Sequence, residues 1–114
     1  MSECLFCAIA SGDIPSDIVL SNDDVLAFRD ITPQAPVHVL VIPRAHRANV
    51  ADLSTADPAL TGALLRAAGA VAAREGIADS GYRIVTNTGE GAGQSVHHIH
   101  FHVLGGRDLA WPPG

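Results

Sequence analysis

The stretch GQSVHHIHFHVL, residues 93–104, carries four of the six histidines of this 114-residue chain. Its apolar and β-branched residues predict a strand over Val96–Leu104, in which successive side chains point to opposite faces. His98, His100 and His102 then share one face of the predicted sheet. A lone histidine is most often a hydrogen-bonded structural residue. Three on one face, next to a glycine-rich loop, indicate a functional site instead.

The spacing argues against a single metal ion held by all three of these histidines. A strand rises about 3.3 Å per residue, so His98 and His102 lie roughly 13 Å apart along the predicted strand. Zinc–nitrogen bonds are only about 2.0–2.1 Å long, and the two outer rings can hardly meet on one ion. The three histidines therefore have separate roles, and His100 in the middle is best placed to face a substrate.

The residues just before the strand, Thr88–Ser95, form a loop with glycine at every second position from Gly89 to Gly93. Glycine lets the backbone turn its N–H groups toward an anion and lets a ligand approach closely. Gln94 and Ser95 add side-chain donors at the mouth of the strand. Such a loop can also be a simple flexible turn, but its place next to the histidine face indicates a phosphate site.

Turn residues divide the rest of the chain into short β-rich runs and two helices. The predicted strands, besides Val96–Leu104, are Ile18–Leu20, Val25–Arg29, Val37–Ile42 and Tyr82–Asn87. A short helix is expected over residues 5–11, closed by Gly12. Strands joined by short turns, with one long helix on one face, indicate an α+β fold on a five-stranded antiparallel sheet.

The long helix carries the clearest local signals. Asp57 is a favourable N-cap, and Pro58 suits the first helical position. Five apolar residues then recur at helical spacing: Leu60, Leu64, Ala67, Ala68 and Val71. Gly76 follows the last turn as a C-cap, and the many alanines suit close packing on a sheet.

Composition places the chain among globular proteins. Hydrophobic residues make up 47% and charged residues 17%, with a formal net charge of −5 at pH 7, and the length fits one domain over residues 1–114. All seven basic residues are scattered arginines, so no basic stripe follows a nucleic acid. No apolar run approaches the ~18 residues of a membrane span, and the N-terminus does not resemble a signal peptide. We therefore expect a cytoplasmic protein.

The two cysteines, Cys4 and Cys7, form a single CxxC pair. A cytoplasmic chain rarely keeps a structural disulfide, so the pair indicates redox chemistry, a metal, or simply two buried thiols. Redox function of the thioredoxin type needs a βαβ context, which the strand pattern does not provide. The long spacing to His46 excludes a DNA-binding zinc finger.

The stretch at residues 93–104 contains His-x-His-x-His followed by apolar residues, which resembles the histidine-triad (HIT) superfamily. Three further segments look like its histidine-triad nucleotide-binding (HINT) branch: DITPQAPVH at residues 30–38, VIPRAH at 41–46 and WPPG at 111–114. The similarity runs over nearly the whole chain, and the WPPG ending favours HINT over the dinucleoside-polyphosphate hydrolase branch. The resemblance implies the HIT fold, with the sheet extended across a homodimer.

By this resemblance, the protein hydrolyses purine nucleoside phosphoramidates and related adenylates. His100 would attack the α-phosphorus, expel an amine and form a nucleotidyl-histidine that water then hydrolyses, releasing AMP or GMP. His38 and His102 would attend the phosphate, and Ser95 would hold its oxygens. Two alternatives stay open, a dinucleoside polyphosphate hydrolase and a nucleotide-binding scaffold with little turnover.

The resemblance also implies a nucleotide pocket. Asp30 matches the carboxylate that grips the ribose hydroxyls, and Asn87 would position the loop or the leaving group. Apolar side chains, which could equally be ordinary core, would line the base and ribose: Phe6, Ile9, Phe28, Ile31 and Leu40. The phosphate would meet the loop at Gly93, Gln94, Ser95 and Val96. Trp111 would reach across the dimer to the leaving group.

A zinc-containing subset of bacterial HIT proteins looks similar around the cysteines. Carried across, the ligands of a closed structural zinc site are Cys4, Cys7, His46 and His98. Such an ion would tie the N-terminal helix to the sheet and give His98 a role of its own. The sequence departs from many relatives at His97, which is a competing fourth ligand. His97 points to the face opposite His100, so His98 is preferred.

Overall fold

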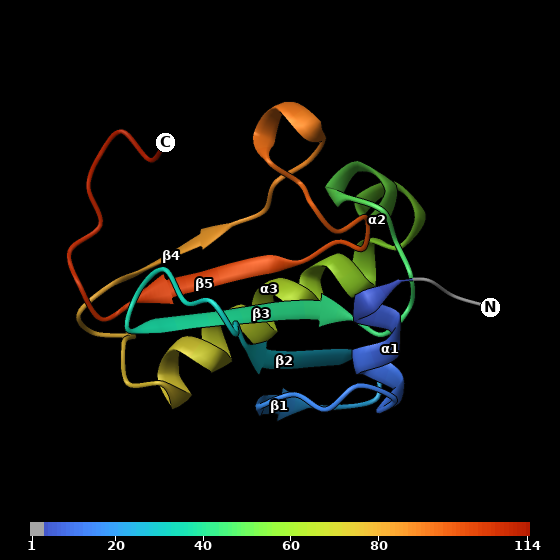
Figure 1. The fold of residues 1–114 in the computed structure, drawn as a ribbon, viewed down its shortest axis with the longest axis horizontal. Helices are drawn as coiled ribbons and strands as arrows, with labels where there is room; N and C mark the ends of the chain where they lie inside the picture. Colours follow the sequence, from blue (N-terminus) through green and yellow to red (C-terminus); the bar gives the residue numbers. More distant parts are fainter. Residues whose placement is uncertain (1–3) are drawn as a thin grey trace.

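The computed structural model describes residues 4–114 and folds them into a five-stranded antiparallel sheet with three α-helices (Figure 1). The strands are β1 (Ile18–Ser21), β2 (Val25–Arg29), β3 (Val37–Pro43), β4 (Tyr82–Val85) and β5 (Phe101–Gly105). The helices are α1 (Leu5–Ser11), α2 (Val50–Ala56) and α3 (Pro58–Arg74), and η1 is a 3-10 turn at Glu90–Ala92. The strand order is β1-β2-β3-β5-β4, with every neighbouring pair antiparallel. The expected α+β fold class is confirmed.

The sheet separates two apolar clusters, because alternate residues of its strands face opposite ways. The first cluster, packed under α3, takes from β2 and β3 the side chains of Val25, Ala27, Val39 and Val41. The second takes their alternates, Leu26, Phe28, Leu40 and Ile42, together with Phe6 of α1. Figure 1 shows α3 behind the sheet and α1 at one end of β2 and β3. With only seven residues, α1 covers one end of the second face.

α3 follows its sequence signals. The Asp57 carboxylate accepts a hydrogen bond from the Leu60 N–H at 3.0 Å, and Pro58 is the first helical residue. The inner face of the helix buries Leu64, Ala67, Ala68, Val71 and Ala72. The helix ends at Arg74 with Glu75 as its cap, and the next residue, Gly76, has φ +75°, a conformation that favours glycine.

α1 spans the expected residues and is anchored at its C-terminal end. Gly12 closes it in a left-handed conformation at φ +88°. The Arg44 guanidinium then joins the helix to the β1–β2 hairpin. It donates to the Ala10 carbonyl at 2.8 Å, to the Ser21 hydroxyl at 2.7 Å and to the Asn22 carbonyl at 2.7 Å. This end of α1 is therefore held by the fold itself.

The last strand begins at Phe101 rather than at the expected Val96. Val41 pairs with Phe101 in the β3–β5 ladder. If the ladder continued, Pro43 would be the partner of Ile99. Proline has no N–H to donate, and the partner segment leaves the ladder at this point. The prediction of a strand over Val96–Leu104 is therefore wrong in its first half.

The departure of residues 96–100 from the sheet changes how the histidines are placed. The Ile99 N–H donates to the Arg47 carbonyl at 2.7 Å instead of to a strand. His98 and His100 lie in this irregular segment, while His102 lies in β5. The strict alternation of faces, and the separation of roughly 13 Å derived from it, therefore do not apply to His98.

Two further elements differ from the sequence prediction. α2 was not expected, although its N-terminus carries a readable signal: the Asn49 side chain accepts from the Asp52 N–H, and the Asp52 side chain accepts from the Ala48 N–H. β4 ends at Val85, short of Asn87. Within residues 4–114, no helix combines the length and apolar character needed to cross a membrane.

Candidate active site and metal centre

Three histidine rings meet on the second face of the sheet. Leu40 of β3 is opposite His102 of β5, so His38 is its diagonal neighbour. His38 Nε2 lies 2.8 Å from His102 Nδ1. The His100 ring lies just before β5, with its centroid 5.0 Å from that of His102. The structure thus brings together the three histidines expected to act on a phosphate.

The hydrogen bonds of this cluster assign the protons on two of the rings. The Gln34 backbone N–H donates to His38 Nδ1 at 3.0 Å, so that nitrogen carries no proton. The His38 proton is then on Nε2, and it is donated to His102 Nδ1. His102 must therefore carry its own proton on Nε2. That nitrogen is buried and has no hydrogen-bond partner among the described residues.

His100 carries its proton on Nδ1, whereas His38 and His102 carry theirs on Nε2. His100 Nδ1 lies 2.9 Å from the carbonyl oxygen of His98, an acceptor, so Nδ1 carries the proton and donates it. His100 Nε2 therefore presents a lone pair. The ring is 6% exposed. An imidazole whose Nδ1 donates to a backbone carbonyl, with its lone pair on Nε2, can act as a nucleophile or a general base.

Electrostatics keep His38 and His102 neutral. Burial lowers the pKa of His38, and the nearby Asp30 carboxylate opposes this only in part. Burial, with the neighbouring His100 and His38 rings, lowers the pKa of His102 to about 4. At pH 7 these two rings act as oriented hydrogen-bond donors rather than as cations.

Asp30 lies beside the histidine pair. One of its oxygens accepts from the Thr32 N–H at 2.9 Å, and the other lies 3.4 Å from His38 Nε2. Asp30, His38 and His102 place one potential ligand atom each within 4.8 Å of the others. The nitrogens of His38 and His102, however, point at each other across a 2.8 Å hydrogen bond, so their lone pairs do not converge on one ion. This cluster is built for hydrogen bonding.

The glycine-rich loop is held by one buried amide. The Gln94 carbonyl oxygen accepts from the Gly89 N–H at 2.9 Å, and its amide nitrogen donates to the carbonyls of Ala48 and Val96 at 2.7 and 3.1 Å. Gln94 is 8% exposed, so its polar atoms are engaged within the protein. Ser95, next to it, is exposed. Gln94 thus fixes the loop that presents Ser95.

The remaining residues expected around a nucleotide occupy different environments. Phe6, Phe28 and Leu40 are buried in the second apolar cluster, with Ile9 and Val96 packed against it. Asn87 is half-buried, and Gly93, at φ +83°, ends η1. Ile31 and Trp111 are 98% and 81% exposed, so the single chain does not bring them into the cluster.

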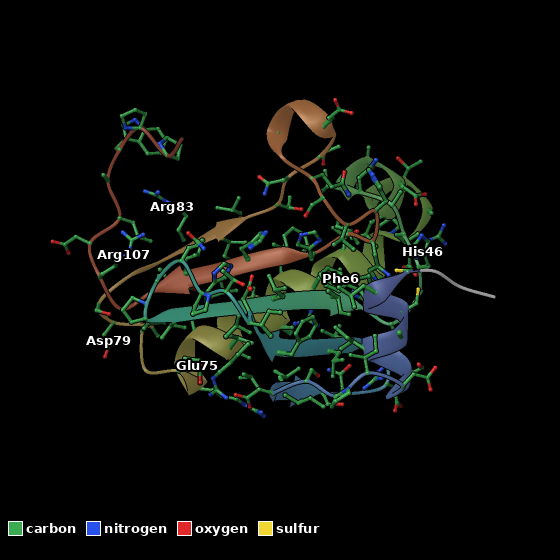
Figure 2. All side chains as sticks on the ribbon, in the orientation of Figure 1. Phe6, His46, Glu75, Asp79, Arg83 and Arg107 are labelled. Carbon is green, nitrogen blue, oxygen red and sulfur yellow. The ribbon has the colours of Figure 1, made fainter. Side chains whose placement is uncertain are left out.

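A second group of polar side chains gathers at the N-terminal end of α1. His98 Nδ1 lies 3.3 Å from Cys4 Sγ and 3.5 Å from Cys7 Sγ, and His46 Nδ1 lies 3.3 Å from Cys7 Sγ. These four ligand atoms all lie within 4.8 Å of one another. Figure 2 shows His46 close to this end of the helix. His97 is exposed and is not in this group.

The donor set and its spacing fit a tetrahedral metal ion. Zinc bonds of about 2.3 Å to sulfur and 2.0–2.1 Å to nitrogen place neighbouring ligand atoms about 3.3–3.8 Å apart. The three sulfur–nitrogen distances are 3.3–3.5 Å. His98 Nε2, 2.8 Å from the Pro43 carbonyl, donates its proton there and leaves Nδ1 free of one. Two thiols and two imidazoles are also the donors that zinc prefers.

The HIT domain family matches residues 11–109. The chain belongs to the HIT domain family. Over 107 residues this HIT protein is 48% identical to the purine nucleoside phosphoramidase of Escherichia coli K12, covering 94% of this chain and 90% of that protein. Over 116 residues it is 50% identical to adenylylsulfatase HINT1 of Arabidopsis thaliana, covering 99% of this chain and 78% of that protein.

Two other similarities concern the metal and the fold. This HIT protein is 49% identical over 115 residues to the 14 kDa zinc-binding protein of Brassica juncea, covering 98% of this chain and all of that protein. The structure of a HIT family hydrolase from Legionella pneumophila Philadelphia 1 is similar at a TM-score of 0.95 and 49% identity, covering 98% of this chain and all of that one. The resemblance to histidine-triad proteins is confirmed.

Several groups of this HIT protein that orient the histidines were not identified from its sequence. Three of these groups are backbone atoms: the Gln34 N–H and the carbonyls of Pro43 and His98. Every residue has such atoms, so the amino-acid type gives no sign of their role. The Thr86 hydroxyl donates to the His100 carbonyl at 3.0 Å. The only sequence signal for this bond is that Thr86 directly follows β4, the strand that pairs with β5.

Proposed function

We propose that the protein is a nucleotidyl hydrolase that cleaves purine nucleoside phosphoramidates and related adenylates, with His100 as nucleophile. The observation that carries this proposal is the paired orientation of His100 and His102. One presents a lone pair at Nε2, and the other has a buried Nε2–H with no partner among the described residues. A phosphate, which offers an electrophilic phosphorus flanked by acceptor oxygens, satisfies both groups at once.

The first chemical step is attack by the His100 Nε2 lone pair on the α-phosphorus. A P–N bond forms at His100, and the bond to the leaving amine breaks with its electron pair, which takes up a proton. The His100 ring, now substituted at Nε2, becomes cationic. Its Nδ1–H strengthens its hydrogen bond to the His98 carbonyl and so stabilises this charge. Water then attacks phosphorus, restores the lone pair and releases the nucleoside monophosphate and a proton.

His102 and His38 act as a donor pair in both steps. His102 Nε2–H donates to a phosphate oxygen, while His38 and the Gln34 N–H behind it hold the tautomer. Because these rings are already oriented and buried, no reorganisation is needed as charge develops on the oxygens. Ser95 and the loop backbone supply further donors to the same oxygens.

The nucleoside is bound on the same face. Asp30 accepts from the ribose hydroxyls, and the base is lined by Phe6, Ile9, Phe28, Ile31 and Leu40. In support, four of these apolar residues belong to or pack against one cluster beside His100. Ile31 is exposed and available to a ligand. Purine specificity is supported by the phosphoramidase and adenylylsulfatase names of the two enzymes at 48% and 50% identity.

We also propose that Cys4, Cys7, His46 and His98 hold a structural zinc ion. With four protein ligands the ion has no open position, so it supplies cross-linking rather than Lewis-acid chemistry. The tetrahedral spacing of the donor atoms and the zinc-binding relative support this assignment.

A homodimer is the third part of the proposal. β4 is an edge strand with Tyr82 and Ile84 each 39% exposed, and Trp111 in the tail is largely exposed. An exposed apolar edge favours pairing with a second copy. Trp111 of each subunit would then reach the partner's leaving-group side. Monomeric behaviour in light scattering at full activity would remove this part.

The decisive experiment is incubation of the zinc-loaded protein with adenosine 5′-phosphoramidate. We expect release of AMP and, after rapid quench in alkaline denaturant, which preserves the acid-labile P–N bond, a mass increase of one adenylyl group located at position 100. His100→Ala should give neither, while His97→Ala, a change at an exposed neighbouring histidine, should keep both. Absence of turnover and adduct in a folded wild type that still binds AMP would contradict the proposal and favour a nucleotide-binding scaffold.

A further inference from the structure

His98 connects the metal centre to the nucleophile through one residue. Its side chain faces both cysteines through Nδ1, and its Nε2 donates to the Pro43 carbonyl. Its backbone carbonyl accepts the proton of His100 Nδ1. The residue is fully buried. Any rotation of the His98 backbone that accompanies loss of its side-chain contacts therefore moves the acceptor that orients His100.

Phe6 makes a second connection between the metal centre and the nucleophile. It lies in the CxxC segment between Cys4 and Cys7, and its ring stands edge-on to the His100 ring, with the centroids 5.0 Å apart and an interplanar angle of 85°. It also meets the His98 ring edge-on at 6.0 Å. Phe6 is 4% exposed. The segment that supplies two metal ligands thus also supplies a wall for the nucleophile.

We propose that the Cys4–Cys7–His46–His98 centre, when it holds its metal ion, positions the His100 imidazole for attack through the His98 carbonyl and the Phe6 ring. This inference rests on the proposed function, because it takes His100 as the nucleophile and assigns a metal ion to the four side chains. It gives the ion a role in the rate of the reaction without placing it in contact with the substrate.

The two parts that the metal ion would connect are both short. α1 has seven residues, and a helix of this length is not stable by itself. Residues 96–100 lie outside the sheet, so no ladder fixes them. Single hydrogen bonds hold this segment instead: the Ile99 N–H to Arg47, the Thr86 hydroxyl to His100, the Gln94 amide to Val96 and His98 Nε2 to Pro43. Beside the packing of Phe6 on the His98 and His100 rings, the metal bonds would add a direct cross-link between the N-terminal turn of α1 and the backbone beside His100.

The fold should survive loss of the ion. Arg44 ties the C-terminal end of α1 to the hairpin, and the α3-side cluster contains none of the four ligands. Removing the metal is thus expected to loosen Phe6 and His98 while the sheet remains. A displacement of the nucleophile by about 1 Å is enough to slow a reaction roughly 100-fold.

The test compares the zinc-loaded protein with metal-free protein prepared with a chelator under reducing conditions. Far-ultraviolet circular dichroism checks that both are folded. Long-range proton–nitrogen correlation spectra report the tautomer of the His100 ring without substrate. We expect one Nδ1–H tautomer in the zinc form and averaged tautomer signals in the metal-free form. Identical His100 signals in the two forms would overturn the proposal.

Single-turnover kinetics with adenosine 5′-phosphoramidate give a second readout on the same two samples. We expect adenylylation of His100 to slow by roughly 10- to 100-fold without zinc, with AMP affinity changed far less. Equal adenylylation rates in two folded forms sink the coupling but leave the proposed function standing. No adduct even in the zinc form sinks the proposed function itself.

Phe6→Leu tests the second connection with the metal in place, and it decides the question if metal-free protein unfolds. Zinc content by metal analysis should equal that of the wild type, while kcat falls about tenfold and the His100 tautomer signals broaden. Leu5→Ala is the matched control, because Leu5 lies in the same segment but is 47% exposed. It should leave kcat, zinc content and spectra unchanged. A Phe6→Leu effect confined to KM would overturn the positioning role.

Discussion

His38 Nε2 and His102 Nδ1 lie 2.8 Å apart, and this one hydrogen bond determines where both rings carry their protons. The Gln34 N–H occupies the other nitrogen of His38, so the proton of His102 is left on Nε2. This arrangement requires both the His38 ring and the His102 ring to be neutral, and burial lowers the pKa of each ring.

The pH dependence of stability follows from the pKa of His102. The unfolded ring titrates near pH 6.5 and the folded ring near pH 4, so between these values the unfolded chain binds more protons. Stability contributed by the neutral ring is fully present above pH 6.5 and is lost as the pH falls toward 4. Urea unfolding should show a loss of up to roughly 3 kcal/mol over this range. In His102→Gln the slope should be clearly flatter, and an unchanged slope would contradict the assignment.

The backbone donor to His38 can be tested with a pair of variants. Gln34→Pro removes the N–H that bonds His38 Nδ1, whereas Gln34→Ala keeps it and loses only the side-chain bond to the Thr32 carbonyl. With its tautomer no longer fixed, His38 should support turnover less well, and we expect kcat to fall roughly tenfold in Gln34→Pro. Gln34→Ala should stay near wild type. Equal losses in the two variants would remove the role of the backbone donor.

The metal ligand next to the catalytic motif is tested by metal analysis of two adjacent histidine variants. His98→Ala removes a ligand atom that lies 3.3 Å from Cys4 Sγ and should abolish stoichiometric zinc. His97→Ala changes an exposed ring outside the cluster and should keep one zinc per chain. Full zinc retention in His98→Ala would show that the ligand assignment is wrong.

Gln94 should contribute to stability through the loop it holds. Gln94→Ala removes the partner of the Gly89 N–H and of the Ala48 and Val96 carbonyls. We expect the free energy of unfolding to fall by about 1–3 kcal/mol, because these backbone groups lose a buried hydrogen bond. Glu90→Ala, on the exposed side of the same loop, should change the free energy of unfolding by less than about 0.5 kcal/mol. Denaturant unfolding of both variants measures the difference. A Gln94→Ala variant as stable as Glu90→Ala would show that the loop does not depend on this amide.

The packing of α3 on the sheet is tested by neighbouring leucines. Leu64 is fully buried, and Leu64→Ala should cost about 2–5 kcal/mol through lost contacts and the cavity it leaves. Leu65 is 49% exposed, and Leu65→Ala should cost less than about 1 kcal/mol. Thermal unfolding of the two proteins should rank them in this order, and similar midpoints would contradict the packing described.

Those parts of the fold whose signals are local were predictable from the sequence. Asp57 and Pro58 mark the start of α3 because capping and the fixed φ of proline act within one turn. The early end of the ladder beside Pro43 was not predictable, because it depends on which residue of a distant strand pairs with the proline. For the same reason the sequence pattern predicts a strand from Val96, whereas β5 begins at Phe101.

The residues of the site were predictable in kind but not in arrangement. The histidine spacing and the CxxC pair indicated which side chains come together, and His98 does lie with Cys4 and Cys7. The tautomers, in contrast, are set by the Gln34 N–H and the His98 carbonyl, which no side-chain pattern encodes. The engagement of Gln94 within the protein likewise depends on the approach of Ala48 from the loop that precedes α2.

The hydrogen bonds from Gln34 through His38 to His102 all run in one direction. The Gln34 N–H donates to His38, and His38 donates in turn to His102. This series ends in an N–H without net charge. A ligand atom that meets this end must be an acceptor: an oxygen of a phosphate completes the series, whereas a hydroxyl or ammonium hydrogen would set two donors against each other. Under the proposed function, the His102 Nε2–H therefore favours a phosphate oxygen over a donor group at this position.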